Sequence, residues 1–185
     1  MKLAKVKLKS ASPYTQGKFH QTEKLDKENP ADYEERTWRN KCHLNDKGNV
    51  CIPPSALKNC LRDAAQYLSI SIPGKGKSLY TKHFKAGVQC LEMVDTGTHI
   101  DKVTPLRLFV PANGQTGGGK RVVRIFPTLP AWEVEVDFYI LDETITEEVF
   151  RHVLSEAGKF IGIGSLRPIN GGWHGRFEVV SVDWQ

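Results

Sequence analysis

The feature that most constrains the fold is a glycine-rich segment near the C-terminus, residues 157–177. It holds six of the chain's sixteen glycines, the cations Lys159, Arg167 and Arg176, and no acidic residue. Glycine loses more conformational entropy on folding than any other residue, so a cluster indicates backbone that needs positive φ or a close approach. Freed backbone N–H groups in such a loop form concave sites that suit phosphate oxygens. We interpret the segment as a basic loop that grips a polynucleotide backbone; a flexible connection is the alternative.

Length and composition favour a soluble globular protein. The chain has 185 residues, of which 39% are hydrophobic and 25% charged, and this predicts a single domain over residues 1–185. No apolar run is long enough to span a bilayer, and residues 2–10 alternate lysine with apolar side chains, unlike a signal peptide. We therefore expect a cytoplasmic protein with no membrane partner. The four cysteines lack C-x-x-C spacing, so we expect reduced, structural thiols and neither a metal nor another cofactor.

Positive charge is segregated along the chain. The formal net charge is +5, yet the windows 64–91, 102–132 and 157–177 contain twelve lysines and arginines and no acidic residue. The remaining residues carry more acids than bases. Such segregation favours a polyanionic partner, most simply nucleic acid, whereas ordinary solvated surfaces mix both signs.

Apolar periodicity predicts strands at 2–10, 88–94, 132–141 and 177–184, and helices at about 53–68 and 145–157. The turn at 45–49 also predicts a small hairpin between 41–44 and 50–52. The second helix is expected to open with a capping box from Thr144 to Glu147 and to end at Gly158. In chain order these elements give an α+β fold of the ferredoxin-like (RRM-like) βαββαβ type, with two helices on one face of an antiparallel sheet.

Three insertions, at about 11–49, 73–87 and 110–130, interrupt this order. Each brings cations close to aromatic or glycine residues. The second lacks the spacing of a P-loop, so nucleotide hydrolysis is not inferred. The third predicts a protruding β-hairpin with a basic, glycine-rich tip at 114–121. Alternating cations and rings suit a single strand, because phosphates meet lysine while bases stack at roughly 1–3 kcal/mol each. A disordered lysine-rich loop at 73–87 is the alternative.

These patterns define the expected nucleic-acid-binding residues. Phosphate contacts are expected from Lys18, Lys75, Lys77, Lys82, Lys85, Lys120, Arg121, Arg124, Arg167 and Arg176. Stacking is expected from Tyr14, Phe84 and Trp173, and close backbone approach from Gly171, Gly172 and Gly175. No catalytic residue is expected, although His20 and His174 are weak candidates.

Three short motifs resemble one protein superfamily. Residues 50–65, VCIPPSALKNCLRDAA, resemble the start of the first helix in the RAMP superfamily of CRISPR-associated proteins, where IPGSSLKG is typical. The matching positions are Ile52, Pro53, Ser55, Leu57, Lys58, Leu61 and Arg62. Pro54 and Asn59 stand where the family often has glycine. The glycine-rich segment is similar to the RAMP loop between the last helix and last strand, and Ser12-Pro13-Tyr14 with Gly17 is similar to the loop after the first strand of crRNA-binding backbone subunits.

The resemblance implies a single-stranded RNA binder of modified RRM type that self-associates or assembles with other effector subunits. Residues 110–126 would form a thumb that separates bases. No residue type alone distinguishes RNA from DNA. A CRISPR subunit and a phage or mobile-element relative are both consistent with the motifs.

Two alternative functions stay open. One is a metal-independent endoribonuclease of RAMP type, in which a histidine acts as general acid or base. The other is a phage protein that mimics a backbone subunit and inhibits a host effector complex. For that role the acidic strand face of Glu133, Glu135 and Asp137 would be a subunit interface, although a solvated face has the same pattern.

Overall fold

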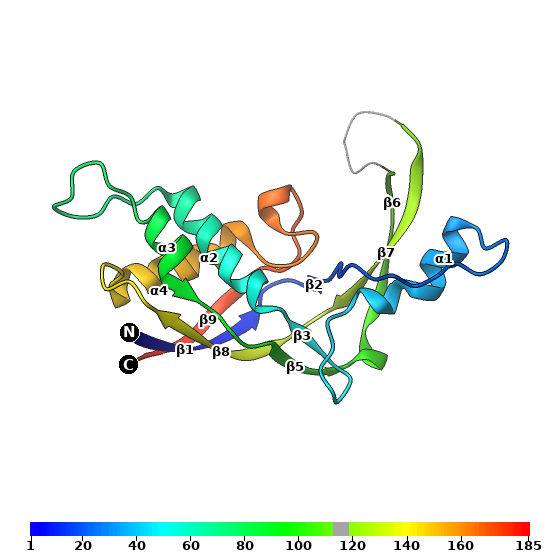
Figure 1. Cartoon of the computed structure of the whole chain (residues 1–185), viewed down its shortest axis with the longest axis horizontal. Coiled ribbons are helices and arrows are strands. Elements are labelled where there is room, and N and C mark those ends of the chain that lie inside the picture. Colours follow the sequence, from blue (N-terminus) through cyan, green and yellow to red (C-terminus); the bar gives the residue numbers. More distant parts are fainter. Residues whose placement is uncertain (113–118) are drawn as a thin grey trace.

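The computed structural model describes residues 1–112 and 119–185, so part of the expected hairpin tip lies outside the described residues. Its central sheet has four antiparallel strands in the order β4-β8-β1-β9 (Figure 1). Their bounds are β1 Lys2–Ser10, β4 Val88–Gln89, β8 Glu133–Ile140 and β9 Phe177–Trp184. The fold is therefore mixed α+β with antiparallel sheets.

Helices cover one face of this sheet, namely α2 (Pro54–Leu68), α3 (Thr81–Gly87) and α4 (Glu147–Glu156) (Figure 1). Apolar and charged residues alternate along most of β1 and β8, so most of the apolar side chains point to the face that the helices cover. Val6 and Val136, for example, pair across the two strands and are both buried. Phe138 of β8 meets Phe150 of α4 with ring centroids 5.6 Å apart. No helix in the described part of the chain is long and apolar enough to cross a membrane.

The opposite face of the sheet carries a ladder of matched charges. Lys5, Lys7 and Lys9 of β1 lie directly across from Asp137, Glu135 and Glu133 of β8. Lys7 also forms an ion pair with Glu133 at 2.7 Å. The acidic strand face that the sequence displays is thus paired with the lysines of the neighbouring strand.

The insertions build a second group of elements beside the central sheet. Strands β6 (Thr104–Pro111) and β7 (Arg121–Leu129) form a long antiparallel hairpin that projects away from the central sheet, and β2 (Tyr14–Thr15) pairs with the base of β7 (Figure 1). The other elements are α1 Pro30–Thr37, η1 Trp38–Lys41, β3 Asn49–Ile52, β5 Val94–His99, η2 Ile100–Lys102, the π-helix η3 Ala157–Ile161 and η4 Pro168–Asn170. The protruding hairpin predicted from the third insertion is present.

Two strand predictions need correction. The strand expected at 88–94 ends after Gln89, and the chain then leaves the central sheet because Val94 in β5 pairs with Ile52 of β3 in a separate two-stranded sheet. A small hairpin expected between 41–44 and 50–52 is reduced to one bridge, between Leu44 and Val50.

One loop prediction and two predictions about the ends of a helix also need correction. The 73–87 insertion is not a loop throughout, since residues 81–87 form α3. Helix α4 is capped by Thr146, whose hydroxyl accepts a bond from Val149 N, and not by Thr144. The helical conformation does not end at Gly158 but continues as η3 to Ile161. Gly162 follows with a φ of +69°.

Candidate nucleic-acid interface

The three segments that carry the sequence resemblance meet at one pocket of about 360 Å³. They are the chain after β1, the first turns of α2 and the glycine-rich loop. We name this the α2 pocket. Its lining includes Tyr14, Gln16, Gly17, Lys18, His43, Pro53, Ser55, Ala56, Asn59, Gly164, Ser165, Arg167 and Asn170. Segments about 40 and 150 residues apart in sequence therefore share one site.

Backbone hydrogen bonds tie the glycine-rich loop to the chain after β1. Ser165 donates its N–H to the carbonyl of Thr15 at 3.1 Å, and Gly175 donates to Pro13 at 2.6 Å. The hydroxyl of Ser12 donates to the carbonyl of Trp173 at 2.8 Å. These bonds fix the loop, so it is not the flexible connection considered as the alternative.

Gln16 holds the floor of the α2 pocket, although no sequence pattern predicts a role for it. Its buried side chain donates to the carbonyl of Cys51 at 2.7 Å and accepts from His43 N at 2.7 Å. The amide thus joins the first insertion to β3, immediately before α2. A lone buried glutamine gives no periodic signal in sequence, so only the structure identifies it.

Two cations line the α2 pocket. Lys18 is exposed, whereas Arg167 is held by Asp63 of α2 with 3.2 Å between Nη1 and Oδ2. His43 lies beside them. Burial lowers the pKa of His43, and the nearby charge of Lys18 lowers it further. The ring is therefore disposed to be neutral at neutral pH in the unliganded protein.

The glycines of the loop are needed mainly by the protein's own backbone. A side chain at Gly172 would collide with the carbonyl of Leu166, and one at Gly175 would collide with the carbonyl of Ile163. Gly175 also has a φ of +74°. Gly175 is buried, which corrects the expected approach of a ligand at that residue, whereas Gly172 is half-buried and its approach to a ligand stays a prediction. Gly171 is exposed and has open space beside it.

Two of the three expected stacking residues belong to the core. Tyr14 and Phe84 are 1% and 0% exposed, so neither presents a ring face to a ligand. Phe84 is buried because it lies on the inner face of α3, and Tyr14 packs edge-on against Trp132 at 6.2 Å. Trp173 is 58% exposed and is the one that is available.

The lysines of the second insertion do not line the α2 pocket. Lys75, Lys77, Lys82 and Lys85 are exposed, but they follow the C-terminus of α2, whereas the pocket lies at its N-terminus. A helix of 15 residues separates its two ends by about 22 Å. Figure 1 shows the 73–80 loop and the β6–β7 hairpin at opposite ends of the molecule. The cations are therefore distributed over more than one surface.

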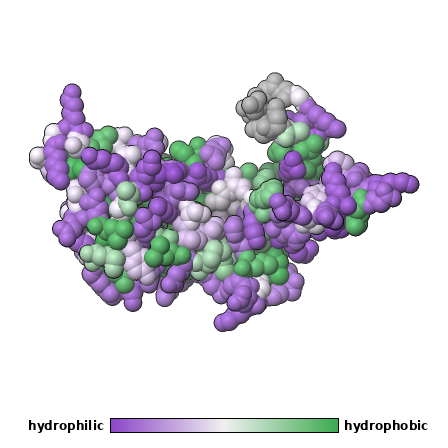
Figure 2. All heavy atoms as spheres, viewed as in Figure 1, coloured by the Kyte–Doolittle hydropathy of each residue, from purple (hydrophilic) through white to green (hydrophobic). Residues whose placement is uncertain are grey.

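The cations of the hairpin make internal contacts as well. Arg124 lies 3.7 Å from the buried carboxylate of Glu34, and Arg121 donates to the carbonyl of Phe109 at 2.7 Å with its guanidinium over that ring. Lys120 is exposed. Phe109, for which the sequence predicts no role, is 60% exposed, and Figure 2 shows apolar surface on the hairpin stem.

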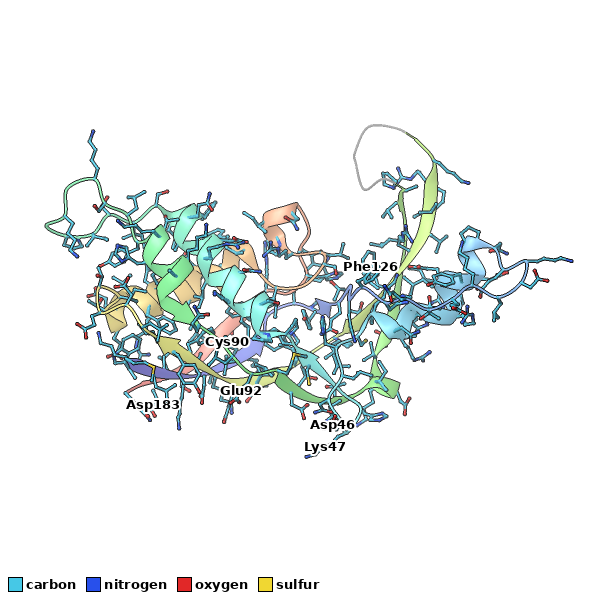
Figure 3. The ribbon with its side chains drawn as sticks, in the orientation of Figure 1. Asp46, Lys47, Cys90, Glu92, Phe126 and Asp183 are labelled. Carbon is cyan, nitrogen blue, oxygen red and sulfur yellow. The ribbon has the colours of Figure 1, made fainter. Side chains whose placement is uncertain are left out.

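Helix α1 packs against the base of the hairpin. Glu34 of α1 accepts a hydrogen bond from Ile125 N of β7 at 2.8 Å. The ammonium of Lys41, in η1 directly after α1, lies 5.7 Å from the ring centroid of Phe126 in β7, which Figure 3 labels. The first and third insertions are thus packed together and support one another.

The two catalytic candidates do not share a site. His20 bonds Thr22 at 3.0 Å and stacks on Tyr33, whereas His174 is 8% exposed inside the glycine-rich loop. Burial lowers the pKa of His174. Across residues 1–112 and 119–185, no cluster of three or more His, Cys, Asp or Glu side chains is arranged to hold a metal. The four cysteines are free and buried.

Two solved structures have a similar fold. No protein-family model matches the sequence, and no curated protein sequence matches it significantly. The fold is similar to that of a chain in a solved Type III-B Cmr complex.

One similar chain belongs to the cryo-EM structure of the Type III-B Cmr-beta bound to cognate target RNA. It has a TM-score of 0.54 and 11% sequence identity, and the match covers 99% of this chain and 60% of that chain. The present chain thus spans about three fifths of that subunit. Another is the crystal structure of Cmr6 from Pyrococcus furiosus, with a TM-score of 0.49 and 14% identity over 96% of this chain and 98% of that one.

Proposed function

We propose that this protein binds single-stranded nucleic acid, with RNA as the natural ligand, as a subunit of a CRISPR-type ribonucleoprotein or a phage counterpart of one. The observation that carries the proposal is the α2 pocket, where Lys18 and Arg167 meet the glycine-rich loop and the start of α2. We assign the framework to the ferredoxin-like βαββαβ plan, supported by the sheet order β4-β8-β1-β9, and the β6–β7 hairpin to the thumb.

The electrostatics of the α2 pocket suit a phosphate backbone. Among the described residues, no side chain caps the start of α2. The N-cap residue Pro53 and the first-turn residues Ser55 and Ala56 line the pocket. The positive end of the helix dipole therefore adds to the charges of Lys18 and Arg167. Asp63 orients Arg167 and offsets part of its charge, so the exposed Lys18 contributes most to long-range attraction.

The open face of the central sheet is a poor alternative surface. Its lysines lie opposite acidic residues at every one of the three paired positions from Lys5 to Lys9. A polyanion gains little from such a face, because attraction and repulsion cancel within a Debye length. This supports binding on the helix side of the molecule, beside the exposed Trp173.

The assembly partners follow from the similar fold. A chain of this fold occurs in a multi-subunit complex bound to target RNA. We extend that setting to the present chain as assembly with other effector subunits or with copies of itself, in the cytoplasm.

Fluorescence anisotropy tests the function directly. Labelled single-stranded RNA, single-stranded DNA and duplex are titrated with the protein at roughly 50 and 200 mM salt. We expect single strands to bind best and affinity to fall steeply with salt, because bound cations displace condensed counterions. Absence of binding to every oligonucleotide at the lower salt concentration overturns the proposal. Denaturing gels of the same RNA samples in EDTA test the endoribonuclease alternative.

A further inference from the structure

A second pocket, of about 690 Å³, lies between η3 and the start of β9, at the edge of the central sheet. We name it the η3–β9 pocket. Its lining includes Ser155, Gly158, Lys159, Phe160, Arg176 and Glu178. The glycine-rich loop contributes to both pockets, since Arg167 lines the α2 pocket and Arg176 lines this one.

Phe160 supplies an aromatic platform in this pocket. Its side chain is 46% exposed, and its ring stacks on Tyr67 of α2 with centroids 5.6 Å apart and planes 30° apart. The contact limits the ring's freedom, so little entropy is lost when another flat group packs against it. Gly158, which also lines the pocket, packs directly against the backbone carbonyl of Phe177, so η3 lies close to the start of β9.

Two cations and one acidic residue line the pocket beside Phe160. Arg176 is exposed and has no acidic partner among the described residues, while its backbone N–H is fixed by the hydroxyl of Ser12 at 2.9 Å. Lys159 is exposed and bonded to Glu156 at 2.7 Å. Glu178 also lines the pocket and is exposed, and in the sheet it lies across from Lys9 of β1.

We propose that the η3–β9 pocket binds one unpaired nucleotide. The base stacks on Phe160, its phosphate contacts Arg176, and Glu178 accepts a hydrogen bond from an exocyclic amino group of the base. A ring face, a cation and an acceptor are the three elements by which proteins recognise single-stranded bases. Adenine, cytosine and guanine carry the amino group and uracil does not, so this pocket disfavours uracil. The inference rests on the proposed function where the nucleotide belongs to a bound strand; a free nucleotide makes the same contacts.

Oligoadenylate and oligouridylate, each labelled for anisotropy, test the pocket against the wild type and Phe160→Ala. We expect the substitution to weaken oligoadenylate binding by roughly 5- to 100-fold, the value of one stacked base. Phe160→Leu keeps an apolar side chain against Tyr67 but removes the ring, and we expect a similar loss. Glu178→Gln is expected to reduce the preference for adenylate over uridylate. Leu91→Ala, another exposed apolar position, is the control and should bind as the wild type does.

The outcomes separate this inference from the proposed function. Wild-type affinity in Phe160→Ala or in Phe160→Leu, with oligonucleotide binding otherwise intact, overturns the stacking site and leaves the proposed function in place. If the wild type binds no oligonucleotide, the proposed function fails and 5′-AMP is titrated against the protein by NMR. Shifts that disappear in Phe160→Ala then support a free-nucleotide site, and their absence in the wild type overturns the pocket as well.

Discussion

The buried carboxylate of Glu34, in α1, accepts a hydrogen bond from the backbone N–H of Ile125, in β7, at 2.8 Å. The two residues are 91 positions apart. Lys41 pairs with the same carboxylate and donates to the carbonyl of Ile125 at 2.9 Å. One acidic side chain therefore fixes the base of the projecting hairpin to α1.

Replacement of Glu34 should destabilise the fold strongly. Glu34→Ala leaves the ammonium of Lys41, whose side chain is 14% exposed, without its partner, and breaking a buried pair in this way costs about 3–5 kcal/mol. Urea unfolding measures the change. Glu35→Ala is the matched control, because Glu35 forms only an exposed ion pair with Arg107 and should matter little. Equal effects of the two substitutions would contradict the role of Glu34.

Two glycines of the loop should respond differently to alanine. Both Gly171 and Gly175 have positive φ, of +81° and +74°, which costs an L-residue roughly 1–2 kcal/mol. Only at Gly175 would the new methyl group also collide with the backbone, at Ile163. Thermal unfolding should therefore show a clearly larger loss for Gly175→Ala than for Gly171→Ala. A similar loss at both sites would mean that the loop relaxes around the added group.

The two aromatic residues Phe84 and Trp173 should separate stability from binding. Phe84→Ala removes a fully buried ring and should lower the free energy of unfolding by about 3–5 kcal/mol. Trp173→Ala removes an exposed ring, so stability should hardly change. Its RNA affinity should instead fall by roughly 5- to 100-fold. Unfolding curves and anisotropy titrations of both variants give the comparison, and unchanged affinity in Trp173→Ala would remove it from the interface.

The cations of the α2 pocket should matter more for binding than those of α3. Removing Lys18 and Arg167 together should lower the slope of log K against log salt by about one unit for each phosphate that is no longer neutralised. The double variant Lys82→Ala with Lys85→Ala removes the same net charge from α3, whose lysines do not line the α2 pocket. We expect its slope to stay near the wild-type value. A larger drop in slope for the α3 variant than for the α2-pocket variant would indicate that RNA binds at α3 instead.

RNA affinity should rise as the pH falls, through His43. Burial, and then the charge of Lys18, lower the pKa of this residue in the free protein. A phosphate bound beside it favours the imidazolium, so the pKa in the complex lies above that of the free protein. Binding then takes up a proton between the two values, and affinity increases through that window on acidification. Anisotropy between about pH 8 and 5 should show this rise for the wild type and not for His43→Asn.

The regular framework is predictable from the sequence, because one face of each main element is buried. Alternation in β1, β8 and β9 and the 3.6-residue period in α2 survive in the structure with nearly the expected bounds. The three segments that meet at the α2 pocket also carry recognisable motifs. The prediction of a loop at α3 was wrong because seven residues are too short to show a period, and the glycines and lysines of 73–87 are typical of a loop.

The roles of individual side chains are less predictable, because the residue type does not show whether a side chain points into the core or into solvent. Tyr14 and Trp173 are both aromatic residues in loop-rich segments, yet one is buried and the other exposed. The distribution of cations depends on the length and direction of α2, which carries Lys75 and Lys82 away from Lys18. Gln16 and Phe160 give no sequence signal, because each acts through contacts with residues distant in the chain.

The alternating lysines and carboxylates of β1 and β8 make the molecule electrically two-sided. On the ladder side the three lysines of β1 face acidic residues of β8 and also Asp183 and Glu178 of β9, so this side offers a polyanion no net attraction. Under the proposed function, RNA bound on the helix side would therefore leave the ladder side uncovered.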